Sequence, residues 1–140
     1  MSKSTYIALI LLAVGCVFYA VFRQDIIFFS LLDNPKFLKL IQINIHYQEG
    51  NILLYFLLFC LPDMLWYMAL LLFQKQFYYA GSVFSKILFC LSVSLPFFLE
   101  FMQYFGIIPG TFDIADIGYY LLTLLIFLIL WKKIKTKKRI

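Results

Sequence analysis

Residues 51–73 read "NILLYFLLFCLPDMLWYMALLLF", and this stretch decides the fold class. Its side chains are almost entirely apolar, and Asp63 is the one charged residue among them. A helix needs about 20 such residues to cross a hydrocarbon layer roughly 30 Å thick. The stretch therefore predicts a transmembrane helix.

The whole chain has a similar character, since 64% of its 140 residues are hydrophobic. A soluble domain is roughly half apolar, so this chain is predicted to lie in a membrane. Further apolar stretches cover 4–22, 83–105 and 114–131. We expect an all-α, polytopic membrane protein: one membrane domain over 1–140, built as a four-transmembrane-helix bundle. The first stretch is long and lacks an A-x-A cleavage pattern, so it is predicted to be a retained span rather than a signal peptide.

The longest stretch between predicted spans is 23–50, which includes "KFLKLIQINIHYQEG" after Asn34-Pro35. Its polar residues fit a helix, although Gln42, Asn44 and His46 also alternate as in a strand. We favour an amphipathic helix along the outer membrane interface, between spans one and two. His46 is expected at the surface, or as a partner of nearby carboxylates.

Basic residues set the predicted orientation, because lysine and arginine concentrate on the cytoplasmic side. With four spans, both termini and the tail 132–140 lie together, and we place them in the cytoplasm. Three cations then fall outside, against nine inside: Lys3, Lys75, Lys86, Lys132, Lys133, Lys135, Lys137, Lys138 and Arg139. The tail is expected to anchor this topology, with a weaker alternative of attraction to anionic lipid and no role with nucleic acid.

The residue types give no sign of a metal or cofactor. Cys16, Cys60 and Cys90 lie in apolar runs without C-x-x-C spacing, so we expect small buried thiols rather than disulfides or ligands. His46 is the single histidine, which makes a His/Cys metal site improbable. We therefore predict no bound metal and no cofactor.

Asp63 is the first polar anomaly, because it falls near the middle of its span. A charged aspartate there costs at least about 2.5–3.5 kcal/mol, so the side chain should be protonated, hydrogen-bonded inside the bundle, or facing water. Pro62 removes a backbone donor beside it and predicts a kink. Trp66 and Tyr67 follow one turn later and are candidates to line the same cavity.

The third span carries a polar stripe towards its outer end. Glu100 follows Pro96 by four residues and precedes Gln103 by three, so all three share one helical face. After a turn at Pro109-Gly110, Asp113 and Asp116 begin the fourth span. These aspartates are favourable as helix caps, and they also open onto the same surface as Glu100. Carboxylates at one membrane mouth are typical of cation binding, proton transfer or headgroup recognition.

Glu100-x-x-Gln103, a loop, then Asp113-x-x-Asp116 before a final apolar helix resembles the VanZ-like family of integral membrane proteins. The likeness covers roughly residues 60–125. The stretches "LPDMLW" and "GTFDIADIGYY" are most similar to small members in Bacteroidota-type bacteria. This family is named for a protein associated with tolerance to glycopeptide antibiotics. The resemblance implies a multi-pass protein of the bacterial inner membrane, in which the four polar residues act together in the cell envelope.

The chain departs from the family pattern at two places. An arginine of the family's turn would fall near Gly110 or Thr111, where this chain has none. Tyr120 stands where the pattern has an asparagine, which makes Tyr120 a further ligand-binding candidate. The resulting pocket is more acidic than the family pattern implies.

Three functions remain open on the sequence. The leading hypothesis is a non-enzymatic or accessory membrane protein whose outward pocket binds a polar lipid-linked or envelope ligand. Its candidate ligand-binding residues are Asp63, Glu100, Gln103, Asp113, Asp116 and Tyr120. The alternatives are an enzyme in which Glu100 and Asp116 act as general acid and base on a lipid-linked substrate, or a subunit of a larger membrane complex. Expected partners are membrane lipids, a lipid-linked headgroup or a partner membrane protein.

Overall fold

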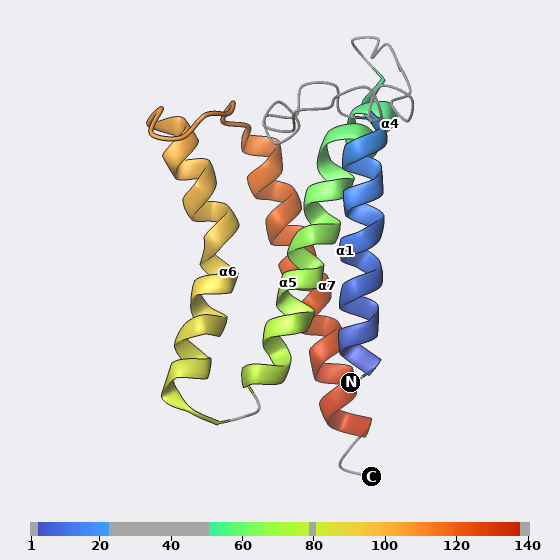
Figure 1. The fold of residues 1–140 in the computed structure, drawn as a ribbon, viewed down its shortest axis with the longest axis vertical. Helices are drawn as coiled ribbons and strands as arrows, with labels where there is room; N and C mark the ends of the chain where they lie inside the picture. The colour runs from blue at the N-terminus through green and yellow to red at the C-terminus, as the bar shows by residue number, and fades with distance from the viewer. Residues whose placement is uncertain (1–2, 23–50, 79–80, 138–140) are drawn as a thin grey trace, which may run out of the picture.

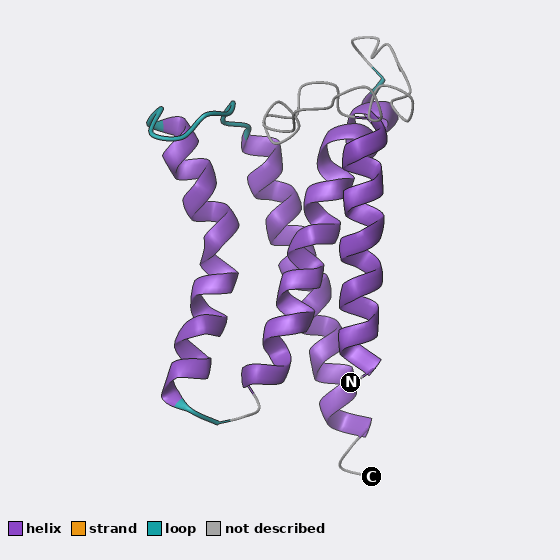
Figure 2. Cartoon of the chain, in the orientation of Figure 1, coloured by secondary structure: helices purple, strands orange, loops and turns teal. Residues whose placement is uncertain are grey.

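A computed structural model describes residues 3–22, 51–78 and 81–137, with side-chain environments as far as Lys132. The predicted interfacial segment 23–50 and the end of the basic tail lie outside the described residues. Within the described ranges every regular element is helical, which confirms the all-α prediction (Figure 2).

Four helical spans make up the described chain. α1 covers Lys3–Phe22, and α6 covers Val83–Tyr104. The second span joins three elements end to end: α4 (Ile52–Tyr55), the π-helical turn η1 (Phe56–Cys60) and α5 (Leu61–Tyr78). α7 covers Ile114–Lys137. All four spans are long and apolar enough to cross a membrane, so the described chain has the architecture of a multi-pass membrane protein.

The span boundaries agree with the sequence prediction to within one residue, except at two ends. The second span continues to Tyr78, beyond the expected residue 73, and the last helix continues to Lys137, beyond the expected residue 131. Both extensions are amphipathic or basic segments that a hydropathy pattern leaves out.

α5 lies at the centre of the bundle and packs against α1, α6 and α7. The two described ends of the chain, Lys3 and Lys137, lie at one end of the bundle (Figure 1). We call this the basic end, because Lys3, Lys75, Lys86 and Lys132 occur in the helical turns nearest to it. The opposite end, where α6 finishes and α7 begins, is here called the acidic end.

The second span passes through Pro62 with a specific local geometry. The turn before it is π-helical, and the N–H of Leu61 donates to the carbonyl of Phe56 five residues earlier. Proline offers no N–H to the carbonyl of Leu58, and a wider turn relieves the clash of the ring with that carbonyl. The span therefore continues through Pro62 rather than ending there.

Pro96 is tolerated within α6 by a contact from the neighbouring helix. The hydroxyl of Tyr67 donates to the carbonyl of Val93 at 2.9 Å, in the turn that precedes the proline. Near a helical proline, backbone carbonyls lose regular partners and are satisfied by side chains of adjacent helices. Tyr67 thus ties α5 to the weakened turn of α6.

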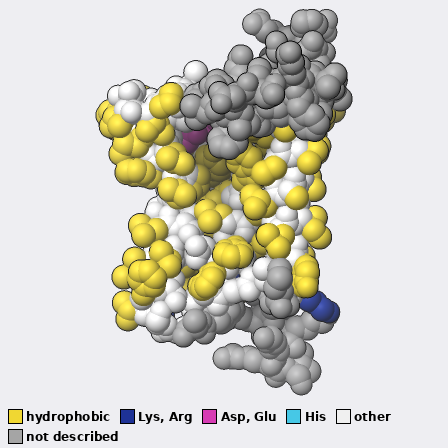
Figure 3. All heavy atoms as spheres, viewed as in Figure 1, with side chains coloured by type: hydrophobic (Ala, Val, Ile, Leu, Met, Phe, Trp, Pro, Cys, Tyr) yellow, Lys and Arg dark blue, Asp and Glu magenta, His cyan; other side chains and the backbone are white. Residues whose placement is uncertain are grey.

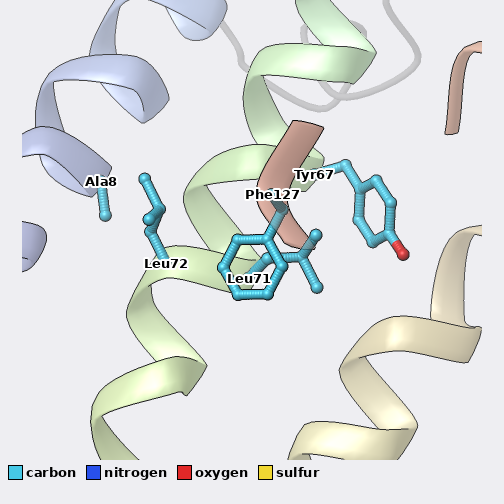
Figure 4. Close-up of a cluster of buried hydrophobic side chains, with 5 residues drawn as sticks. All are labelled: Ala8, Tyr67, Leu71, Leu72 and Phe127. Carbon is cyan, nitrogen blue, oxygen red and sulfur yellow. The ribbon is translucent and has the colours of Figure 1, made fainter. Parts of the chain in front are cut away.

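A small apolar core holds the bundle together around α5. Ala8 of α1 faces Leu72, while Leu71 lies against Phe127 of α7 (Figure 4). Tyr67 points away from these towards α6. Leu71 is 0% exposed and Phe127 1%. Many other large apolar side chains are exposed on the bundle surface, as expected where lipid is the solvent (Figure 3).

Trp66 and Tyr67 do not line one cavity, so that expectation was wrong. Trp66 packs on α1, where a Cβ added at Gly15 would lie 2.5 Å from its Cδ1 atom. Tyr67 contacts α6 and α7 through the rings of Phe97 and Tyr120. One residue along a helix turns the side chain by about 100°, and at the centre of a bundle that rotation changes the neighbouring helix.

Candidate functional site

Glu100 is the focus of the candidate site. It lies in the last turns of α6, about 6 Å along the helix from Tyr104 at 1.5 Å per residue. Its side chain is only 5% exposed, and Oε2 is buried with no hydrogen-bond partner among the residues that the structure describes. An unsatisfied buried acceptor costs about 1–3 kcal/mol, and more when it is charged. The fold therefore maintains a costly carboxyl group at a fixed place.

Asp113 faces Glu100 from the start of α7. The backbone N–H of Asp113 interacts with the Glu100 carboxyl group, and the Asp113 side chain adds a nearby negative charge. Asp113 is also the cap predicted from sequence, because its Oδ1 accepts the N–H of Ala115 at 2.8 Å. Its other oxygen, Oδ2, accepts the hydroxyl of Tyr55. Both carboxylate oxygens thus have protein donors.

Asp116 lies one turn further along α7, in its first turn. Its charge is close enough to act on Glu100, and also on Tyr55 and Cys60 of the second span. The same carboxylate therefore acts on groups from the second, third and fourth spans. We call the group formed by Tyr55, Cys60, Glu100, Asp113 and Asp116 the acidic cluster.

Gln103 supports the loop that leads into the cluster. A Cβ added at Gly110 would lie 2.5 Å from Nε2 and 2.8 Å from Cδ of Gln103. Gly110 also has a φ of +141°, which side chains other than glycine rarely adopt. The absence of a side chain at Gly110 therefore lets Gln103 lie directly across the loop backbone.

The two remaining candidates lie deeper in the bundle. Asp63 occupies the first turn of α5, and its charge acts on Cys60, which connects it with the lower side of the acidic cluster. Tyr120 packs in a group of three rings with Tyr67 and Phe97, at centroid distances of 5.7 and 6.0 Å. The structure thus joins four of the six candidates at the helix ends, and places Tyr120 in the aromatic packing beneath them.

Sequence reasoning missed two members of the cluster. Tyr55 is 58 positions from its partner Asp113, so no local pattern predicts their contact. Cys60 was expected to be a small buried thiol, and its burial is confirmed at 1% exposure, but the carboxylates near it were not foreseen. The expectation of burial was wrong for Cys16 and Cys90, which are exposed on the bundle surface.

The arrangement of the cluster favours hydrogen-bond donors over anions as ligands. Acidic side-chain atoms are visible near the acidic end, beside hydrophobic side chains (Figure 3). Ionised carboxylates only accept hydrogen bonds, and Glu100 Oε2 is an acceptor in need of a donor. In the described ranges, no group of three or more His, Cys, Asp or Glu side chains is placed to hold a metal ion.

Comparisons of this chain with protein-family models, with curated proteins and with solved structures found no match in any of the three.

Proposed function

We propose that this chain is a VanZ-like membrane protein of the bacterial cell envelope that binds the polar headgroup of an envelope lipid at its acidic end. One observation carries the proposal: Glu100 is 95% buried at a helix end, and its Oε2 has no hydrogen-bond partner within the described part of the chain. A folded protein rarely leaves such a group unsatisfied unless the position serves a function.

The chemistry of the cluster defines the headgroup. The Asp113 carboxylate already accepts hydrogen bonds from the Ala115 N–H and the Tyr55 hydroxyl, so its role is to position the loop rather than to bind a ligand. Glu100 offers the open acceptor, and Asp116 adds negative charge beside it. A headgroup with amine or hydroxyl donors complements this arrangement, whereas a bare phosphate would meet charge repulsion.

The location of the cluster supports a lipid rather than a dissolved ligand. Glu100 lies about 6 Å from the end of a membrane span, at the depth where lipid headgroups meet hydrocarbon. The exposed neighbours Phe101, Tyr104 and Phe105 form an apolar rim on the same helix end. Aromatic side chains are favoured at that level of a membrane.

Headgroup binding is testable with two lipids that differ in donors. Phosphatidylethanolamine carries N–H donors on its ammonium group. Phosphatidylcholine has the same positive and negative charges but no N–H donor. We expect the purified full chain in detergent to retain phosphatidylethanolamine preferentially. Glu100→Gln should reduce that retention about tenfold, since a hydrogen bond to a charged group contributes about 1.5–3 kcal/mol. Asp116→Asn should reduce it less.

Lys86→Gln is a matched control, because Lys86 is exposed at the basic end and far along α6 from Glu100. It should leave retention unchanged. Equal retention of the two lipids, or unchanged binding by Glu100→Gln, would overturn the proposal. Turnover of the bound lipid that requires a divalent cation would instead support the enzymatic alternative.

A further inference from the structure

A groove lies at the basic end of the bundle, away from the acidic cluster. Its volume is about 490 Å³, within the range typical of ligand sites. Side chains of α5, α6 and α7 line it, among them Tyr78, Phe89, Leu125, Leu128, Trp131 and Lys132. It is open along one side rather than enclosed.

The groove walls are apolar and held by ring contacts. The rings of Tyr78 and Phe89 each lie 5.3 Å from that of Trp131, centroid to centroid, at near-perpendicular angles. The ammonium group of Lys75 lies 5.7 Å from the Trp131 ring centroid. Edge-to-face and cation–π contacts of this kind fix the orientation of the rings. The walls are thus a preformed apolar surface.

Two lysines lie at the end of the groove nearest the basic end of the bundle. Lys132 lines it and is exposed, and Lys75 lies behind Trp131 at 6% exposure. In the described ranges the acidic residues all lie towards the other end of the bundle. A ligand here meets apolar walls first and cationic groups at the mouth.

The groove is long enough to cover part of one lipid leaflet, whose hydrocarbon is about 15 Å thick. From Leu125 to Lys132 the helix rises about 10 Å, so the groove extends from the membrane surface into the hydrocarbon. A hydrophobic groove open at that depth is filled by lipid chains, because water is excluded there. The lysines then select the headgroup.

We infer that this groove binds one acyl chain of an anionic phospholipid, with the lipid phosphate beside Lys132. The observation behind the inference is the combination of an apolar groove with cationic groups at its mouth. This site is separate from the proposed headgroup site, and it takes a lipid of opposite character.

The test measures lipids retained by the full chain in mild detergent, by native mass spectrometry with phosphatidylglycerol and phosphatidylcholine of identical chains. We expect the wild-type chain to retain phosphatidylglycerol at least about fivefold better, as one lysine near an anionic headgroup should give. Lys132→Gln should abolish most of that preference. Leu128→Trp, which fills the groove, should reduce retention of both lipids.

Two variants serve as controls. Lys86→Gln removes an exposed lysine at the same end outside the groove, and Leu122→Trp adds the same bulk to an exposed site of α7 nearer the acidic end. Both should behave like the wild type. Equal retention of the two lipids by the wild type would overturn the inference. Unchanged lipid binding by Leu128→Trp would also overturn it. So would a wild-type chain that self-associates instead of retaining lipid, if Leu128→Trp disrupts that self-association.

Discussion

Asp113 shows how one residue can satisfy two interpretations that the sequence left open. It caps α7 by accepting a hydrogen bond from the Ala115 N–H, and it also accepts a hydrogen bond from the Tyr55 hydroxyl of the second span. Its backbone N–H also interacts with Glu100. The cap therefore has a structural role that fixes the geometry of the neighbouring carboxyl group.

Removing the Asp113 carboxylate should destabilise the bundle. Asp113→Ala should lower the free energy of unfolding by about 1–2 kcal/mol, because the cap contributes roughly 1 kcal/mol and the Tyr55 hydrogen bond adds about 0.6. Asp113→Asn should cost much less, since asparagine also caps helices well. Unfolding in mixed micelles of increasing denaturing detergent measures the difference.

Tyr55→Phe separates the two contributions of Asp113. In the Tyr55→Phe background, Asp113→Ala should cost only the capping energy, which gives a coupling of about 0.6 kcal/mol between the two side chains. Additive effects of the two substitutions would show that the Tyr55 contact contributes nothing to stability.

At the scale of elements, the contact of α1 with α5 depends on a missing side chain. Gly15 is buried against Trp66, and a Cβ at Gly15 would lie 2.5 Å from Cδ1 and 2.6 Å from Nε1 of that ring. Small residues at membrane helix interfaces permit this close approach. The Trp66 indole lies against the α1 backbone at Gly15, where there is no side chain.

Gly15→Ala should therefore separate α1 from α5. We expect a loss of about 1–3 kcal/mol in the free energy of unfolding, as is usual when a packed interior must expand. Gly118→Ala is the matched control, because a Cβ at Gly118 in α7 meets nothing within 4 Å. That control should be neutral or up to about 1 kcal/mol stabilising, since alanine favours the helix. Equal effects of the two substitutions would contradict this packing.

The elements also show why proline does not end these spans. Pro62 is accommodated by the π-helical turn Phe56–Cys60, and Pro96 by the hydroxyl of Tyr67 donated from α5 to Val93. The first solution is local to one helix. The second needs a neighbour, so it arises only once the bundle has assembled.

At the scale of the whole molecule, charge is separated along the bundle axis. The described lysines lie towards the basic end, and the acidic cluster lies at the opposite end. We propose that the basic end is cytoplasmic, since positive residues are retained on that side of bacterial membranes. The acidic cluster then faces the cell envelope.

Cysteine labelling tests this orientation. In a chain without its three native cysteines, Thr111→Cys at the acidic end should react with an impermeant maleimide in intact cells. Val83→Cys at the basic end should react only after the membrane is opened. Both positions are exposed in the structure. The reverse pattern would invert the proposed topology and remove the acidic cluster from the envelope side.

The sequence alone determined the number and positions of the spans, because hydrocarbon thickness imposes a minimum length of apolar helix. It also indicated Glu100 and Asp116, since carboxyl groups in so apolar a chain need a reason. The tertiary structure decided which groups meet them. The contact of Tyr55 with Asp113, and the different helices reached by Trp66 and Tyr67, depend on how four helices pack around α5. Periodicity gives the face of a helix, whereas only packing selects the helix that this face contacts.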